Sequence, residues 1–248
     1  VIAFEQAPWP QGPGPRKRVL VIGAGIGGLS AAIRLQNVGY QVEIYEKNTV
    51  PGGKMHRLEF DGHSFDVGPS LVMMPSIYRE IFEIAGRNPD DYIPMVKLDP
   101  MYDVYFNSSP LRSYSISNDL EELHKIFESK GFENSMGLYD YLSSIYKRYQ
   151  IALEHFITKP FRHKRDFYNP KTLWNALKLK TFDSADQMMS KFIPDKDFQQ
   201  MLSFQTLYIG VSPKKGPSLY NIIPMIELLY GVWFIKGGMF TMASQMAK

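Results

Sequence analysis

The residues best suited to chemistry lie near the start of the chain, where glycines follow a short apolar run. The run Arg18–Ile22 predicts a strand buried on both faces of a parallel sheet. It leads directly into Gly23-Ala24-Gly25-Ile26-Gly27-Gly28, and apolar residues with helical spacing follow over 29–35. A strand, a glycine-rich turn and a helix in this order present free backbone N–H groups to the phosphates of a dinucleotide.

Three of these glycines have distinct predicted roles in such a turn. Gly23 permits the tight passage from strand to helix, and Gly25 lets the backbone approach a pyrophosphate without a Cβ in the way. Gly28 lets the helix pack closely on the strand. We expect Ala24 and Gly27, in the same turn, to face the cofactor as well.

An acid ends the second predicted strand, residues 41–46. Glu46 follows Gly28 by 18 residues, close to the spacing of about 20 found in dinucleotide-binding folds. Its carboxylate can accept hydrogen bonds from a ribose diol and would repel a 2′-phosphate, so NAD or FAD is favoured over NADP. A glycine-rich turn without a ligand is the weaker alternative, because strand, glycines, helix, strand and acid all occur in order.

More cofactor-binding residues are predicted just after this acid. Gly52 and Gly53 precede Lys54, so a close approach of the backbone to an anion can be combined with a positive charge. The pair Asp61-Gly62 then lies between two alternating segments and predicts a two-residue β-hairpin turn. A simple NAD-binding domain would not continue with a hairpin here, which favours FAD.

At this point the sequence resembles a known family. Glu46-Lys47 followed by Gly52-Gly53-Lys54 is similar to the amine-oxidase and phytoene-desaturase superfamily of FAD proteins. That superfamily usually has Arg at this position. Lys54 keeps the positive charge of such an Arg but cannot form its two parallel, bidentate hydrogen bonds. Phe65–Ser70 resembles the carotenoid-desaturase form of the next motif, which passes near the flavin ring in that family. The resemblance therefore implies cofactor contacts for Lys47 and for the last three residues of that motif, Gly68, Pro69 and Ser70.

Later stretches are similar to the bacterial dehydrosqualene (diapophytoene) desaturases within this family; they are 179–181, 185–187, 204–210, 216–220 and 234–239. The resemblance runs from about Arg18 to the last residue. Because family members are about twice as long, we expect the chain to represent the N-terminal half of such a protein. The resemblance implies bound FAD and desaturation of a long apolar polyene by hydride transfer to flavin.

No catalytic acid or base is predicted. After one carbon of the polyene gives up hydride, the adjacent carbon loses a proton. The conjugated substrate itself stabilises the cation formed by hydride loss, so the resemblance does not imply a particular acid or base. The polar candidates are expected to be structural; they are His56, His63, Asp66 and Tyr208.

The predicted fold class is α/β: a Rossmann-like FAD-binding domain with an inserted, mainly helical substrate and membrane domain. We expect a flexible leader over 1–17, the FAD-binding module with its hairpin over 18–75, the helical domain over 76–233, and a return toward the FAD domain over 234–248. Further local signals are a strand over 102–106 and a long helix over 139–156. Helix caps are predicted at Ser76, at Asn118 or Asp119, and at Asp195.

Composition excludes several function classes. The chain has 248 residues and no cysteine, so it has neither disulfides nor thiolate chemistry. Its five histidines lack metal-ligand spacing, and a net charge of +3 is too mild to argue for nucleic acid. The 13 methionines and the many aromatic residues suit an apolar ligand cavity or an aromatic-rich core about equally. The N-terminus lacks a signal-peptide pattern, and the most apolar stretch, 220–235, is too short and too polar to span a bilayer.

A basic and aromatic segment, Lys159–Lys180, suits the surface of an anionic membrane. A solvated basic face is an equally good interpretation of its composition. A membrane-dissolved polyene favours the first interpretation slightly, so we expect a cytoplasmic protein peripheral to the membrane. The final electron acceptor, quinone or oxygen, is left open.

Two alternatives to the desaturase remain. One is another flavoenzyme of the superfamily: a carotenoid isomerase, a terminal-methyl oxidase of carotenoids, or an amine oxidase. The other is a non-catalytic carrier of prenyl groups, of the type of the GDP-dissociation inhibitors, which share the expected fold.

Overall fold

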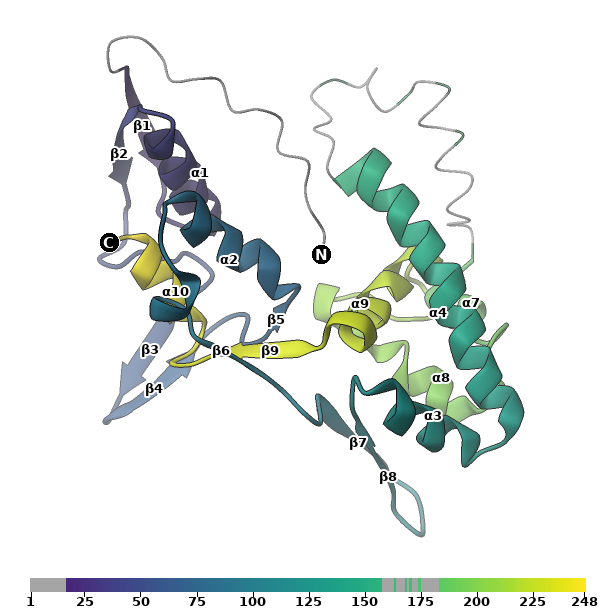
Figure 1. Ribbon diagram of the computed structural model, residues 1–248. Helices are drawn as coiled ribbons and strands as arrows, with labels where there is room; N and C mark the ends of the chain where they lie inside the picture. Colours follow the sequence, from purple (N-terminus) through teal and green to yellow (C-terminus); the bar gives the residue numbers. More distant parts are fainter. Residues whose placement is uncertain (1–16, 158–162, 164–167, 169, 171–173, 175–182) are drawn as a thin grey trace. The chain divides into compact units, whose positions relative to one another are not determined.

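The computed structural model describes residues 17–157, 163, 168, 170, 174 and 183–248. These residues form two compact units, drawn with their elements labelled in Figure 1. Of the described residues, 17–98 and 232–248 form the first unit, and those between 99 and 231 form the second unit. The predicted leader and most of Lys159–Lys180 lie outside the described residues.

The first unit begins with the predicted β–α–β crossover. Strand β1 (Arg18–Ile22) and strand β2 (Gln41–Tyr45) pair in parallel, with Val19 opposite Val42. Helix α1 (Ile26–Asn37) connects them and buries Leu29 and Ala32. A parallel pair needs such a crossover, because its two strands run in the same direction.

The predicted hairpin follows as β3 (Arg57–Phe60) and β4 (His63–Asp66), with Phe60 opposite His63. Asp61 and Gly62 have φ of 52° and 79°. Both turn residues are left-handed, as a type I′ hairpin turn requires. The Asp61-Gly62 turn is therefore confirmed.

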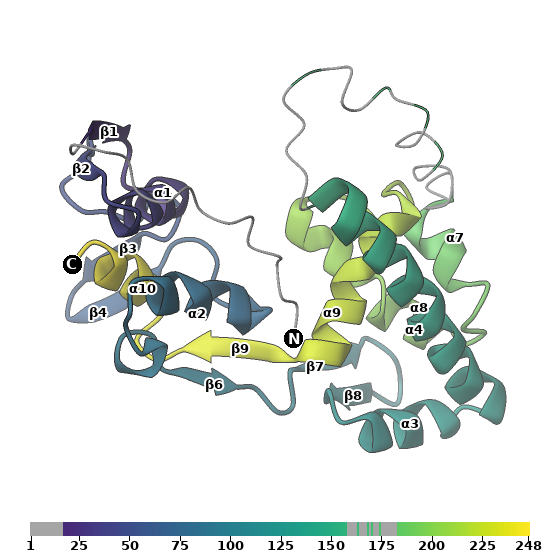
Figure 2. The same ribbon diagram turned by 45° about the horizontal axis from the view of Figure 1, so that its top comes forward.

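A small antiparallel sheet joins distant parts of the sequence. Its strand order is β5 (Val72–Met73), β9 (Val232–Ile235), β6 (Met95–Lys97), and Figure 2 shows β9 running beside β6. Because β9 follows the whole second unit in sequence, that unit is an insertion between β6 and β9. The insertion begins at Asp99, so residues 76–98, assigned to the helical module from sequence, pack in the first unit.

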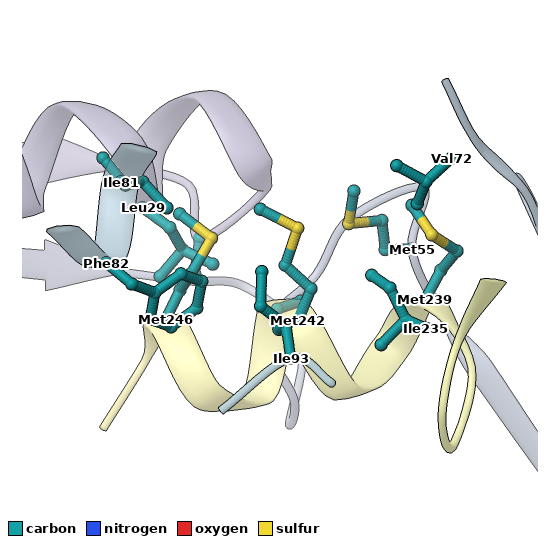
Figure 3. Close-up of a cluster of buried hydrophobic side chains, with 12 residues drawn as sticks. Leu29, Met55, Val72, Ile81, Phe82, Ile93, Ile235, Met239, Met242 and Met246 are labelled. Carbon is teal, nitrogen blue, oxygen red and sulfur yellow. The ribbon is translucent and has the colours of Figure 1, made fainter. Parts of the chain in front are cut away.

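The core of the first unit is rich in methionine (Figure 3). Helix α10 (Met239–Met246) contributes Met239, Met242 and Met246, which pack with side chains from α1 and from α2 (Pro75–Ile84). The other fully or mostly buried members include Leu29, Met55, Val72, Ile81, Phe82, Ile93 and Ile235. Flexible methionine side chains fill irregular gaps between elements of different geometry. The buried methionines of this unit therefore contribute to its core.

The second unit is mainly helical. It starts with the hairpin of β7 (Tyr102–Phe106) and β8 (Arg112–Ile116). The helices that follow are α3 (Leu120–Glu128), α4 (Phe132–Ala152) with a π-helical end (Leu153–Ile157), α7 (Ala185–Met189), α8 (Lys196–Met201) and α9 (Ile222–Tyr230). Three short 3₁₀ segments complete the described elements: η1 (Pro89–Asp91) in the first unit, and η3 (Phe204–Ile209) and η4 (Ser218–Asn221) in the second.

Most predicted helix starts are correct. Asp119 accepts hydrogen bonds from the N–H groups of Glu121 and Glu122, and Asp195 caps α8 in the same way. Ser76 is not a cap, because α2 already begins at Pro75, whose missing N–H suits the first helical position. Helix α4 also begins earlier than predicted, at Phe132. Among the residues that the structure describes, no helix has the length and hydropathy needed to cross a membrane.

Candidate dinucleotide-binding site

The glycine turn between β1 and α1 has the geometry of a phosphate-binding loop. Gly23 has φ of 99° and donates its N–H to the carbonyl of Tyr45 at 2.7 Å, which ties the turn to the end of β2. Gly25 is the residue before α1 and accepts the hydrogen bond of Leu29 N–H at 2.9 Å. The first N–H groups of α1 therefore lack intrahelical partners and carry the partial positive charge of the helix N-terminus.

Glu46 is held beside this turn by the backbone. Its Oε2 accepts from Ala24 N–H at 2.7 Å and its Oε1 from Asn48 N–H at 2.9 Å. The hydrogen bonds from Asn48 and Ala24 hold the pKa of the Glu46 carboxyl below its usual value. The carboxylate is thus charged and oriented, and each oxygen keeps a lone pair for a hydroxyl donor.

The second glycine pair packs directly on the first turn. Gly52 N–H donates to the carbonyl of Ala24 at 2.8 Å, and Gly52 forms an isolated parallel bridge with Gly25. A Cβ on Gly53 would lie 3.2 Å from Gly25 Cα, closer than ordinary van der Waals contact. The sequence predicted both glycine segments, and the tertiary structure brings them into backbone contact.

The third predicted segment joins the same cluster. A Cβ on Gly68 would overlap the carbonyl oxygen of Lys54. Next to it, Val67 N–H donates to the carbonyl of His56 at 2.8 Å. Segments around Gly25, Gly53 and Gly68 therefore form one continuous backbone surface, which we call the glycine cluster.

The structure separates the glycines of this cluster into two kinds. A Cβ on Gly28 would overlap the carbonyl of Gly23, and one on Gly52 would lie 2.7 Å from the carbonyl of Met55. Packing of the protein itself therefore requires glycine at both positions. At Gly27 a Cβ would meet no atom within 4 Å, and at Gly25 the only neighbour would be Gly53 Cα at 4.0 Å. Because packing does not require glycine at Gly25 and Gly27, their bare backbone remains accessible to a ligand.

A cavity of about 490 Å³ is lined by residues that follow Glu46 in the chain. Its lining residues are Lys47, Asn48, Thr49, Val50, Gly53 and His56. This volume lies in the range of small-molecule sites. The cavity shares Gly53 with the glycine cluster and Lys47 with the predicted cofactor residues, so a nucleotide with its ribose at Glu46 would find space here.

The remaining predicted cofactor residues, Lys54, Pro69 and Ser70, are exposed at the edge of the glycine cluster. Of the polar candidates, His56 lines the cavity and His63 is exposed beside Phe65 on the hairpin. Asp66 accepts a hydrogen bond from Met239 N–H at 2.9 Å, a structural role at the start of α10. Tyr208 lies in the second unit, on η3.

One notable residue was not predicted. Glu227 is only 2% exposed within α9 of the second unit, and burial raises the pKa of its carboxyl to about 7. Its helix, Ile222–Tyr230, is otherwise apolar apart from tyrosine. A lone acid in such a helix was the available signal in the sequence. No metal-binding group of His, Cys, Asp and Glu side chains occurs among the described residues.

The crossover β1–α1–β2, the glycine turn and the oriented acid define a Rossmann-like dinucleotide-binding fold. Residues 21–87 match the family model of the NAD(P)-binding Rossmann-like domain. The predicted α/β class with an inserted helical domain is confirmed.

The sequence comparison is more specific. Over 231 residues the chain is 46% identical to a 4,4′-diapophytoene desaturase (4,4′-diaponeurosporene-forming) of Staphylococcus aureus, covering 93% of this chain and 46% of that protein. The predicted resemblance to the carotenoid desaturases is thereby confirmed. The chain spans about half the length of the curated relatives it matches.

Solved structures agree on the fold. An oxidoreductase from Methanosarcina mazei superposes with a TM-score of 0.60 at 16% identity, over 93% of this chain and 48% of that one. A Rab GDI from Plasmodium falciparum superposes with a TM-score of 0.52 at 11% identity, over 94% of this chain and 56% of that one. Because one is an oxidoreductase and the other a GDI, the fold alone does not define an activity.

Proposed function

We propose that this chain provides the FAD-binding and part of the substrate-binding structure of a carotenoid desaturase that acts on a long apolar polyene of the diapophytoene type. The glycine cluster beside an ionised Glu46 is the observation that carries the proposal. The 46% identity to a 4,4′-diapophytoene desaturase supports the choice of substrate class.

In this proposal the pyrophosphate of FAD lies at the start of α1, over the bare backbone of Gly25 and Gly27. Glu46 accepts hydrogen bonds from the adenosine ribose, with Lys47 at the cavity wall. Lys54 adds a positive charge near the phosphates, and Gly68, Pro69 and Ser70 continue the surface toward the flavin. All of these residues lie in the first unit or at its cavity.

FAD is proposed over NAD because of the segments that come after Glu46 in the chain. The second glycine pair packs on the first glycine turn, and Gly68, just after the hairpin β3–β4, packs against Lys54. These contacts support a binding surface longer than an adenine nucleotide alone would need. A longer cofactor with a second ring system fits that extension.

When bound, flavin accepts a hydride from an allylic carbon of the substrate. The protein residues hold the hydrocarbon in position and exclude water, since the conjugated substrate stabilises the positive charge that develops. Quinone and oxygen are both suitable final electron acceptors.

We further propose that the protein meets its substrate at the cytoplasmic membrane surface. A C30-type polyene dissolves in the bilayer, and the segment Lys159–Lys180 combines cations with aromatic residues. Trp174, one of the few described residues of this segment, is exposed. A variant with both Trp174→Asp and Lys178→Glu should lose co-flotation with anionic liposomes. Undiminished flotation of this variant would remove the membrane proposal.

The absorbance spectrum of the purified protein tests the cofactor, and product analysis tests the reaction. Flavin bands in that spectrum support an oxidoreductase, whereas a colourless protein that binds prenyl groups supports the GDI-type alternative. Products with longer conjugation support desaturation, and products of unchanged mass support isomerisation. An oxygenated product would identify a terminal-methyl oxidase, and consumption of an amine would identify an amine oxidase.

A further inference from the structure

A carboxyl group in the second unit is buried without a charged partner. Glu227 lies on α9 and is 2% exposed. Its carboxyl accepts hydrogen bonds from Gln205 and Tyr208 of η3, and no ion pair of Glu227 occurs among the described residues. A buried carboxylate needs a cation or several donors to offset the loss of its hydration, so burial here favours the neutral acid.

The titratable side chains around Glu227 are tyrosines. Tyr102 from β7 and Tyr141 from α4 both interact with Glu227, and burial raises the pKa of each hydroxyl above its usual value. The segment η4 also packs on α9 and carries Tyr220 as its one titratable residue, and Tyr230 lies on α9 itself. The charged residues of α4 are at exposed or half-exposed positions; they are Glu133, Asp140, Lys147 and Arg148. The surroundings of Glu227 are therefore neutral at pH 7.

Gln205 joins the buried acid to η3 and to two further elements. Its Nε2 donates to Glu227 Oε2 at 3.0 Å, and it lies 2.9 Å from the Tyr102 hydroxyl and 3.3 Å from the carbonyl of Met201 at the end of α8. Gln205 and Thr206 are completely buried. The inner side of η3 is thus fixed to the rest of the second unit through Glu227 and the groups that share Gln205 with it.

The outer side of η3 is exposed. Leu207, Tyr208 and Ile209 are 57%, 51% and 48% exposed, and Gly210 ends the segment in a left-handed conformation. A short 3₁₀ helix has weaker hydrogen bonds than an α-helix and has little stability of its own. Tyr208 combines both sides, because its ring is half-exposed while its hydroxyl donates to the Glu227 carboxyl. The closed position of η3 therefore depends on the contacts that its inner side makes.

We propose that η3 is a pH-sensitive latch of the second unit, closed while Glu227 is protonated and opened when Glu227 ionises. In the closed state the neutral carboxyl accepts the hydrogen bonds from Gln205 and Tyr208. An ionised carboxylate gains more from water than from these two donors alone. Opening of η3 gives water this access. The latch lies within the second unit and involves neither the cofactor nor the substrate.

The acidity of Glu227 sets the pH range in which the latch responds. Burial raises the pKa of its carboxyl from 4.5 to about 7, opposed by the hydrogen bonds from Gln205 and Tyr208. Once η3 opens, the carboxyl is hydrated and its pKa returns toward the ordinary value. The closed state has the raised pKa, so it is fully favoured below the ordinary value and loses this advantage as pH rises toward 7. Opening of η3 should increase by about 10- to 100-fold between about pH 5 and about pH 9.

The test is amide hydrogen exchange in the protein of full natural length, followed by mass spectrometry of peptides from η3 and from α4. Rates are corrected for the pH dependence of exchange in an unfolded chain. The η3 amides should exchange through a more frequent opening than those of α4, and that opening should increase with pH and level off above about 7.

Two variants with matched controls assign the effect to Glu227. Glu227→Gln cannot ionise, so η3 should keep the protection that the unmodified protein has at about pH 5 across the whole range. Glu133→Gln, an exposed acid of the same unit, should keep the unmodified pH dependence. Tyr208→Phe removes a donor that lowers the pKa of Glu227, so opening should level off at a higher pH. Tyr105→Phe, an exposed tyrosine, is its control.

Three results would overturn the latch. The first is η3 protection that does not change with pH, and the second is an unchanged pH dependence in a folded Glu227→Gln protein. The third is equal opening of η3 and α4 at every pH, because the segment then opens only when the whole unit unfolds. Should Glu227→Gln not fold, Tyr208→Phe decides: levelling off at a higher pH supports the latch, and levelling off at the unmodified pH overturns it. These readouts require no desaturated product, so they are separate from the outcome for the proposed function.

Discussion

The Asp66 carboxylate accepts a hydrogen bond from the backbone N–H of Met239 at 2.9 Å, although the two residues are 173 positions apart in sequence. Asp66 ends the hairpin strand β4, and Met239 begins α10. The neighbouring Arg57 of β3 donates to the carbonyl of Gly237, and its guanidinium lies 5.3 Å from the centre of the Phe240 ring. The hairpin thereby fastens the returning chain to the first unit.

Replacing Asp66 should destabilise that attachment. Asp66→Ala leaves the N-terminus of α10 without its acceptor, and we expect a loss of about 1–2 kcal/mol in the free energy of unfolding. Asp66→Asn keeps an oxygen in place and should lose less. Urea unfolding followed by circular dichroism measures both, and Asp61→Asn at the exposed hairpin turn is the control. Equal stability of Asp66→Ala and the unmodified protein would contradict the structural role.

The two kinds of glycine in the cluster should respond differently to a side chain. Gly25 has φ of −72° and ψ of 174°, which any residue adopts, and its Cβ would meet no atom closer than 4.0 Å. Gly25→Val should therefore fold and lose FAD affinity by about 100-fold or more, because the side chain occupies the place of the pyrophosphate. Gly28→Ala should destabilise the fold itself, because its Cβ overlaps the carbonyl of Gly23. Flavin absorbance after gel filtration distinguishes them, and a yellow Gly25→Val protein would be the contrary result.

Glu46→Gln should weaken FAD binding by about 10- to 100-fold, since charged acceptors make stronger hydrogen bonds to hydroxyls than neutral ones. Backbone hydrogen bonds from Asn48 and Ala24 lower the pKa of Glu46, so the affinity of the unmodified protein should stay constant from neutral pH down past the usual carboxyl range. It should decline only under more acidic conditions, once Glu46 gains a proton. Titration with FAD at several pH values tests this, with Glu59→Gln on β3 as the matched control. An affinity that already declines just below neutral pH would argue against Glu46 as the titrating group.

Glu227 should make stability depend on pH. Its folded-state pKa of about 7 is raised from 4.5, so the protein gives up stability as pH rises through this interval. From this group alone, the free energy of unfolding should be about 3 kcal/mol lower above pH 7 than at pH 4. Glu227→Gln should remove that dependence, and it should be more stable than the unmodified protein at pH 8 but not at pH 4. Unfolding measured at both pH values checks the sign, and parallel pH dependence in both proteins would refute it.

Local sequence patterns were sufficient for several elements of both units. The position of the strand Arg18–Ile22, the turn at Asp61-Gly62 and the helix cap at Asp119 are confirmed because each depends on a few neighbouring residues. The predicted burial of that strand on both faces was wrong, since Leu20 and Ile22 are 58% and 91% exposed. The cap predicted at Ser76 was wrong because α2 begins at Pro75, two residues before Ile77, and its N-cap residue is the left-handed Met74. Either residue is a plausible helix start in isolation, and the path of the preceding strand decided between them.

By itself the sequence determined the β–α–β crossover, the glycine segments, the acid at the end of β2 and the resemblance to the carotenoid desaturases. These features are local in the chain, where backbone sterics and hydrophobic spacing act over a few residues. Only the tertiary structure decided that Gly25 and Gly53 lie in backbone contact, that Asp66 reaches Met239, and that Glu227 is buried with Gln205 and Tyr208. Each of these joins residues distant in sequence, and a carboxyl group acquires its capping role or its shifted pKa from the groups that folding brings around it.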